Sequence, residues 1–327
     1  MSERLLRAGD LFMSGLGILL PFRACRPSDA VRLGVEAERL GYSNVWVPEV
    51  ATFDAISVVA ALAVKTAEVG LGTAVVPLDS RSPASLAMSA ATLSDLAPGR
   101  VALGLGVSTR VIVEGWHGRD FARPLSKVKD ALSIIDQALA GQSTDHEGSS
   151  VSSHGFRLDF PPAVRPKIYL AALGQAMRKL ALESADGVIL NFMPRSKASL
   201  LSSQLQSASK PFDRTCFVRV ALSDQDTDAE RRIRREMASY LRIEQYRNWL
   251  ASLGIDDLSY LPEEDLDSMA RRLSPELIED VAVLGDADRC RTKLAELQSE
   301  GISPIVVPSI RAGDLEGYRV LMNGLAG

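Results

Sequence analysis

Leu173-Gly174-Gln175 is the stretch of the sequence best suited to bind a ligand through its backbone. An apolar run over residues 167–172 precedes it and a helical segment over 174–184 includes its end, which predicts a strand, a tight turn and a helix. Backbone N–H groups at a helix start are unpaired and carry the positive end of the helix dipole. Since Gly174 lets a ligand come close, this turn indicates a phosphate site.

Three charged or titratable side chains could assist such a site. Arg195 follows the next apolar run, where it either helps to hold the phosphate or lies at a rim without a ligand. Glu49 follows Trp-Val-Pro, and its carboxylate lies either buried beside a ligand or exposed. His117, in a polar segment beside Trp116, either braces a surface loop or faces a pocket. Glu49 and His117 are the candidates for proton transfer.

Motifs of several other enzyme classes are missing from the sequence. Gly104-Leu105-Gly106 is followed by neither a third glycine nor a helix, so it is not a dinucleotide fingerprint. These glycines either allow close strand packing or leave room for a flat ring. No GxSxG elbow and no local Cys–His pair supports nucleophilic hydrolysis. No set of His, Asp and Glu has metal-ligand spacing, so no metal is expected.

The elements that must position these residues alternate along the chain. Each apolar run is nearly continuous, which is typical of parallel strands covered on both faces. Strands are expected at 15–20, 44–48, 69–77, 100–106, 167–172, 187–192, 216–222 and 302–308. With helices between them, the pattern predicts an α/β fold, a (β/α)8 TIM barrel formed by a single domain over residues 1–327. An open doubly wound sheet is the alternative.

Two insertions are expected to interrupt the alternation. Residues 142–164, beyond the fourth strand and its helix, are Ser-rich and predict an insertion with a short hairpin. Residues 224–275, after the seventh strand, are charged and predict a helical insertion, with another helix over 274–283. The carboxyl ends of barrel strands share one face, which would bring Glu49, Gly174 and Arg195 to the same end of the molecule.

Composition restricts the partners of the protein. The net charge of −4 gives no basic surface for nucleic acid, and no apolar stretch approaches the roughly 18 residues of a membrane span. The three cysteines are widely spaced and favour a reducing compartment. We therefore expect a cytoplasmic protein with no nucleic-acid or membrane partner.

With these strands and their ends in place, the chain resembles the bacterial luciferase-like superfamily, and within it the coenzyme F420-dependent oxidoreductases. The resemblance covers residues 15–308 and rests on the order and spacing of its features. These are residues 15–20; Gly41-Tyr42 through Trp46-Val47-Pro48-Glu49; residues 70–75; Ala97-Pro98-Gly99-Arg100 leading into Gly104-Leu105-Gly106; Glu114 and His117-Gly118 before Phe121 and Pro124; and residues 166–192.

The resemblance implies a homodimeric barrel that binds F420, or alternatively FMN, at the carboxyl ends of its strands. A bulge with a non-prolyl cis peptide bond would fall at Ala74-Val75 and support the ring. Val107-Ser108-Thr109 would lie along the ring system, and Ala172-Leu173-Gly174-Gln175 would bind the phosphate by backbone N–H. Glu49 would lie near the ring edge or the substrate.

Three positions depart from the pattern of the resembled family. The F420-dependent sugar-phosphate dehydrogenases carry a histidine where Val50 stands and a glutamate where Thr109 stands. Both groups serve as acid or base in that chemistry, so oxidation of a sugar phosphate is not expected. The usual glycine pair of the phosphate loop is Leu173-Gly174 in this chain.

Three functions remain open at this point. The first is an F420-dependent oxidoreductase that moves a hydride between C5 of the deazaflavin and a small organic substrate. The second is an FMN-dependent monooxygenase that uses O2 and reduced flavin from a partner reductase. The third is a cofactor-binding barrel without turnover.

Overall fold

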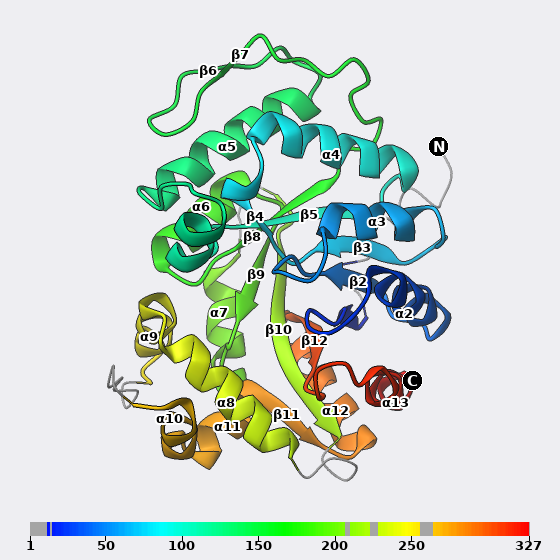
Figure 1. Cartoon of the computed structure of the whole chain (residues 1–327), viewed down its shortest axis with the longest axis vertical. Coiled ribbons are helices and arrows are strands. Elements are labelled where there is room, and N and C mark those ends of the chain that lie inside the picture. The colour runs from blue at the N-terminus through cyan, green and yellow to red at the C-terminus, as the bar shows by residue number, and fades with distance from the viewer. Residues whose placement is uncertain (1–11, 14, 207–209, 223–227, 256–263, 327) are drawn as a thin grey trace.

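The computed structural model describes residues 12–13, 15–206, 210–222, 228–255 and 264–326. Its centre is a closed barrel of eight parallel strand positions surrounded by helices (Figure 1). In order around the barrel these are β1 (Gly17–Leu19), β2 (Asn44–Val47), β3 (Gly70–Thr73) with its continuation β4 (Val76–Pro77), β5 (Val101–Gly106), β8 (Lys167–Ala171), β9 (Gly187–Asn191), β10 (Asp213–Leu222) and β12 (Ser303–Pro308). Because β9 pairs with β10 and β12 pairs with β1, the ring closes. The predicted TIM barrel is confirmed, and the open sheet is wrong.

Both faces of the strands are buried, which explains their continuous apolar sequences. One row of side chains, including Ile18, Val45 and Leu71, packs outward against the helices. The alternate row fills the barrel. Toward its amino end, Phe12, Trp46 and Tyr169 pack with ring centroids 5.3 to 5.7 Å apart. Smaller side chains fill the rest of this interior cluster, namely Leu19, Ala74, Ala102, Ile189, Ile305 and Val307.

The surrounding helices begin at the carboxyl ends of the strands. They are α2 (Pro27–Arg39), α3 (Ala55–Ala63), α4 (Pro83–Leu96), α5 (Pro124–Leu139), α6 (Gln175–Ser184), α7 (Ala198–Gln204), α12 (Ala287–Ser299) and α13 (Leu315–Leu325). Side-chain oxygens of Asp54, Ser82, Asp286 and Asp314 accept backbone N–H groups at the starts of α3, α4, α12 and α13. Among the described residues, none of the helices has the length and apolarity needed to cross a membrane.

The two predicted insertions have different structures. Residues 142–164 contain the expected hairpin, formed by β6 (Asp145–His146) and β7 (Ser153–His154). The segment after β10 contains α8 (Ala229–Leu241), α9 (Glu244–Ala251), α10 (Leu266–Arg272) and α11 (Pro275–Val281). Residues 1–11, 223–227 and 256–263 of the predicted lead-in and insertion lie outside the described part of the chain.

The helix predicted over residues 274–283 is wrong at its end. Helix α11 stops at Val281, and Ala282–Gly285 form β11, which pairs in parallel with Arg219–Leu222 of β10. Ala282 and Val283 are fully buried there, so pairing with the free edge of β10 satisfies the backbone of an apolar segment. Since β9 pairs only as far as Phe217, β11 takes over this edge of β10 beyond the barrel.

Candidate active site at the barrel mouth

The carboxyl ends of β3, β5 and β8 form one side of the barrel mouth, built from small residues. We call this the small-residue side and define it by Ala74, Gly104, Gly106 and Ala171. A Cβ atom added at Gly104 would lie 2.0 Å from the Thr73 carbonyl oxygen, and one at Gly106 would lie 2.7 Å from Val75 Cγ2. Close strand packing therefore requires these two glycines, which was one of the two interpretations of the sequence.

A bulge interrupts the pairing on this side. Gly72 pairs with Ala102 and Val76 pairs with Leu105, so β3–β4 has one residue more than β5 across the gap. The Thr73 hydroxyl fills the gap, because it donates to the Gly104 carbonyl and accepts from the Gly104 N–H, both at 2.8 Å. The Ala74-Val75 peptide bond within the bulge is cis. The bulge and its cis bond confirm the expectation from the resemblance.

The segment after β5 places the predicted residues Val107, Ser108 and Thr109 at the same side. Ser108 has a left-handed backbone with φ of 59°, which turns the chain out of the strand. A π-helix over Val111–Trp116 follows. His117 comes next and is exposed to solvent. Its proton-transfer role stays a prediction, and its exposure favours the interpretation as a residue of a surface loop.

The turn between β8 and α6 has the geometry expected of a phosphate site. Gly174 is the N-cap of α6, with an extended backbone and no side-chain cap hydrogen bond. Apart from its two neighbours in the chain, no heavy atom of the described residues lies within 4 Å of the position that a Cβ atom of Gly174 would take. The start of α6 is therefore open, as the binding of an anion by backbone N–H requires. The roles of Ala172, Leu173, Gly174 and Gln175 in binding stay predictions.

Arg178 stands beside this turn and was not among the residues predicted from the sequence. Its guanidinium donates to the Leu173 carbonyl and lies 4.9 Å from the centre of the Trp249 ring. Burial lowers the pKa of this guanidinium. The sequence could have indicated that Arg178 lies near the turn, because it comes one helical turn after Gly174 at the start of α6.

Arg195, in contrast, is engaged elsewhere. It begins a short 3-10 helix over Arg195–Lys197, and its guanidinium donates to the carbonyl of Glu279 in α11. A polar cavity that also includes Asp280 and Lys293 adjoins it. This contact favours the alternative in which Arg195 is a rim arginine without a ligand. Its role in phosphate binding remains a prediction.

Glu49, which follows β2, forms contacts through both of its carboxylate oxygens. Its Oε1 lies 2.6 Å from Arg81 Nη1, and its Oε2 accepts the Ala55 N–H at 2.9 Å. The hydrogen bond with Glu49 is the largest cause that raises the pKa of Arg81, and Asp54 adds to it. The side chain of Glu49 is 11% exposed, which favours a shielded carboxylate over one exposed at the rim, and its position beside a ligand stays a prediction. Its carboxylate joins β2 to α3, and a role in proton transfer stays a prediction.

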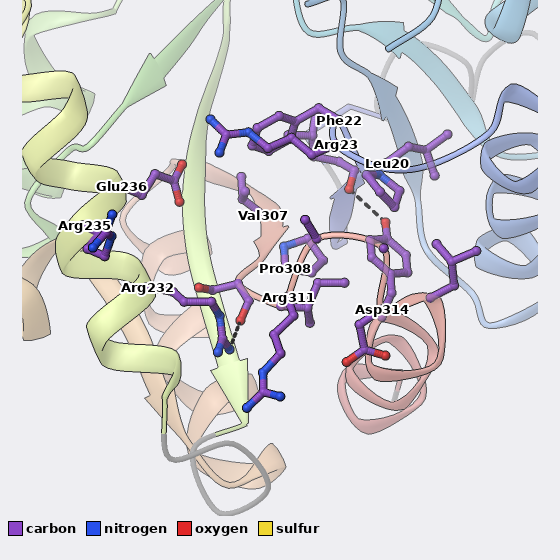
Figure 2. A pocket seen from close by; sticks show the side chains of 18 of the residues that line it. Leu20, Phe22, Arg23, Arg232, Arg235, Glu236, Val307, Pro308, Arg311 and Asp314 are labelled. Carbon is purple, nitrogen blue, oxygen red and sulfur yellow. Dashed lines mark hydrogen bonds between the residues drawn. The ribbon is translucent and has the colours of Figure 1, made fainter. Parts of the chain in front are cut away.

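The opposite side of the mouth contains a cavity of about 400 Å³, which none of the predicted site residues lines. The cavity lies between the ends of β1 and β12, helix α8 and the start of α13 (Figure 2). Leu19 and Val307 form its inner wall, and Arg23, Arg232, Arg235 and Arg311 lie around it. We call this the arginine side and define it by these four arginines. Leu19, Phe22 and Val307 belong to the same apolar cluster as Ala74 and Val75, so the two sides adjoin.

A buried arginine binds the insertion to the barrel next to this cavity. Arg219 of β10 is 3% exposed, and its Nη2 lies 2.8 Å from Glu236 Oε1 in α8. Its guanidinium stacks 3.8 Å from the centre of the Phe192 ring and donates to the Asn191 side chain. Burial alone would lower the pKa of Arg219, but the negative charge of Glu236 raises it overall. An arginine buried inside an apolar strand requires a carboxylate partner. The position of Arg219 in the sequence could therefore have indicated a buried ion pair.

Asn191 connects this arginine to the aromatic residues of α9. Its side-chain amide nitrogen donates to the Tyr246 hydroxyl at 2.9 Å, and its backbone carbonyl accepts from Trp249 Nε1 at 3.0 Å. Burial raises the pKa of Tyr246. Because Trp249 also packs on Arg178, a continuous set of contacts joins Glu236 at the cavity to the turn at Gly174.

Comparisons with known proteins agree with this architecture. A family model described as luciferase-like monooxygenase matches residues 15–303. A Mycobacterium tuberculosis protein named as a coenzyme F420-dependent oxidoreductase is 28% identical, over 94% of this chain and 97% of its own length. The 5,10-methylenetetrahydromethanopterin reductase of Archaeoglobus fulgidus is 26% identical, over 84% of this chain and 87% of its own.

The fold also matches solved structures. An F420-dependent secondary alcohol dehydrogenase in complex with an F420-acetone adduct superposes with a TM-score of 0.75 at 15% identity. The match covers 96% of this chain and 99% of the other. At this identity the likeness shows the shared barrel fold.

Proposed function

The chain belongs to the luciferase-like monooxygenase family, and on that premise we propose that it is a coenzyme F420-dependent oxidoreductase. The main support for a cofactor with a phosphate group is the open start of α6 at Gly174, next to the small-residue side of the mouth. Two relatives matched over most of this chain are named for F420 or for a reductase reaction, and this favours F420 over FMN.

The residues present fit such a cofactor. The side chains of the small-residue side are small or absent, and the ring would lie against Ala74, Val75 and Gly106. The N–H groups after Gly174 would hold the phosphate, and Arg178 adds a positive charge close by. When bound, F420 supplies hydride transfer at C5 of its ring. The protein contributes binding, orientation and exclusion of water.

The substrate is proposed to be a small organic molecule bound against the ring from the opposite side of the mouth. The proposal extends to a homodimer in the cytoplasm, with a separate F420 or flavin reductase as a partner that exchanges the reduced cofactor. Sedimentation of the purified protein tests the homodimer, because monomer at all concentrations would contradict it.

The test of the cofactor is a titration with F420 and, separately, with FMN, followed by tryptophan fluorescence. Trp249 packs on Arg178 beside the proposed phosphate site, so its emission should change when F420 binds. We expect micromolar binding of F420 and weaker binding of FMN. Binding of neither would overturn the proposal and leave the turn at Gly174 as a structural turn only.

An FMN-dependent monooxygenase is the second candidate, because the family model itself is described by that activity. It would use the same barrel and the same turn at Gly174. Oxygen consumption with reduced FMN distinguishes the two. Rapid consumption, together with a preference for FMN in the titration, would select the monooxygenase.

A further inference from the structure

The cavity on the arginine side has an apolar inner wall. Leu19 and Leu20 are 6% and 0% exposed, and Val307 is 4% exposed, so aliphatic carbon forms the inner end of the cavity. Tyr318 also lines it, but its hydroxyl donates to the Leu19 carbonyl at 2.8 Å and its polar atom is thereby satisfied. A volume of about 400 Å³ lies within the range of about 300–1,000 Å³ that is typical of small-molecule sites.

The outer part of the cavity is positively charged. Four arginines and two carboxylates line it. Both carboxylates are already engaged, since Glu236 pairs with the buried Arg219 and Asp314 accepts the Gly317 N–H at 2.8 Å as the N-cap of α13. The charge of Glu236 is therefore compensated from outside the cavity. Arg235 pairs with Asp267, which does not line the cavity, and the four arginines outnumber the two carboxylates of the lining.

Two of the arginines are suited to bind an anion. Arg23 stacks over the Phe22 ring at 5.5 Å and is exposed. Arg311 pairs with Asp228 at 3.3 Å, but their side chains are 69% and 41% exposed. An exposed pair of this kind contributes little energy and opens readily. Figure 2 shows Arg23 and Arg311 on different borders of the cavity, with Val307 between them at its inner end.

We propose that this cavity binds the organic substrate and that the substrate is an anion with an apolar body. Its apolar part lies against Leu19 and Val307, and its anionic group lies near Arg311, with Arg23 on the other border of the cavity. Because this inner wall shares one apolar cluster with Ala74 and Val75, the end of the substrate far from the anionic group faces the small-residue side. This inference rests on the proposed function, which places the ring on that side.

The experiment uses decanoate and decanamide as probes that differ only in charge and hydrogen bonding at the head group. Their binding is measured by calorimetry on the wild-type protein, on the double variant Arg23→Gln/Arg311→Gln, and on Arg39→Gln. Arg39 is exposed at the end of α2, close to the amino end of β2 and so on the opposite face of the barrel. It serves as the control for loss of a positive charge.

We expect the wild-type protein to bind decanoate at least about tenfold more tightly than decanamide, because charge-assisted hydrogen bonds to arginine are strong. The double variant should lose this preference while its affinity for decanamide stays unchanged, and Arg39→Gln should keep it. Equal binding of the two probes, no binding of either at millimolar concentration, or a preference that survives in the double variant would overturn the proposal.

An F420 titration of the same proteins separates this inference from the proposed function. The double variant should bind F420 as the wild type does. Loss of F420 and decanoate binding together would mean that the cavity belongs to the cofactor, and this also overturns the inference. If the wild type binds decanoate selectively but does not bind F420, the proposed cofactor is wrong while the selectivity of the cavity for organic anions stands.

Discussion

The two sides of the barrel mouth are built by different means. The small-residue side depends on backbone and on missing side chains, through Gly104, Gly106, the bulge at Ala74-Val75 and the open turn at Gly174. The arginine side depends on large side chains from segments far apart in the sequence, namely residues 19–23, 232–240 and 307–318. A backbone site suits a constant ligand such as a cofactor, whereas a side-chain site is easily altered and suits a variable substrate.

The largest effect is expected at Arg219, which joins the insertion of the arginine side to the barrel. Arg219→Gln leaves Glu236 without its buried partner and removes the cation stacked on Phe192. Breaking a buried ion pair by removing one member costs about 3 kcal/mol in the free energy of unfolding. Urea unfolding measures this loss, and Arg39→Gln is the control at an exposed site. A loss below about 1 kcal/mol would show that the insertion does not depend on this contact.

A smaller and more selective effect is expected from Gly174→Asp. The new carboxylate would cap α6, which stabilises a helix by only about 0.3 kcal/mol relative to a glycine cap, and Gly174 has open space for it. It would also occupy and repel the proposed phosphate site, so F420 affinity should fall at least about tenfold. Fluorescence titration and thermal unfolding check the two results. Gly174→Ala is the matched control, since it adds a side chain without charge.

The outcome of Gly174→Asp tests the contrast between the two sides. Decanoate binding on the arginine side should stay unchanged in this variant, because the substituted turn does not line that cavity. F420 affinity equal to that of the wild type would mean that the phosphate is held elsewhere, and the small-residue side would lose its proposed role.

The smallest effect concerns Asp54, the N-cap of α3 in the connection that follows β2. Burial alone would raise the pKa of Asp54, but hydrogen bonds from Ser57 and the charge of Arg81 lower it overall. A lowered pKa in the folded state means that the ionised group stabilises the protein above the unfolded pKa of about 3.9 and loses this effect as the pH falls through the folded value. Since Asp54 is 44% exposed, we expect less than about 1 kcal/mol.

Thermal unfolding of Asp54→Asn measures this dependence on pH. The variant should melt below the wild type at pH 7, and the difference should shrink as the pH falls below about 4. A difference that is constant with pH would assign the loss to the shape of the cap at Ser57 rather than to charge.

The barrel and the small-residue side could be predicted because their signals are local or follow one chain direction. Continuous apolar runs specify buried parallel strands, and the position of Gly174 between a run and a helix specifies the open turn. The cis bond at Ala74-Val75 was expected from the resemblance alone, since nothing in the local sequence requires it.

The arginine side could not be predicted in the same way. No local pattern relates Arg23 to Arg232 and Arg311, because the closure of the barrel and the docking of α8 bring them together. Arg219 gave a usable signal as a charge inside an apolar strand, but the sequence does not say which acid pairs with it. The end of α11 was misassigned for a related reason, since β11 exists only through the free edge of β10.

The position of β11 separates the stability of the barrel from the choice of ligand. The eight-membered ring closes through Asp213–Phe217, and the insertion that carries Arg232 and Arg235 is anchored later, at Arg219–Leu222. Evolution can therefore lengthen, replace or repack this insertion while the pairs that close the ring stay intact. The same arrangement gives protein engineers an exchangeable module at residues 228–285, provided that a carboxylate partner for the buried Arg219 is kept.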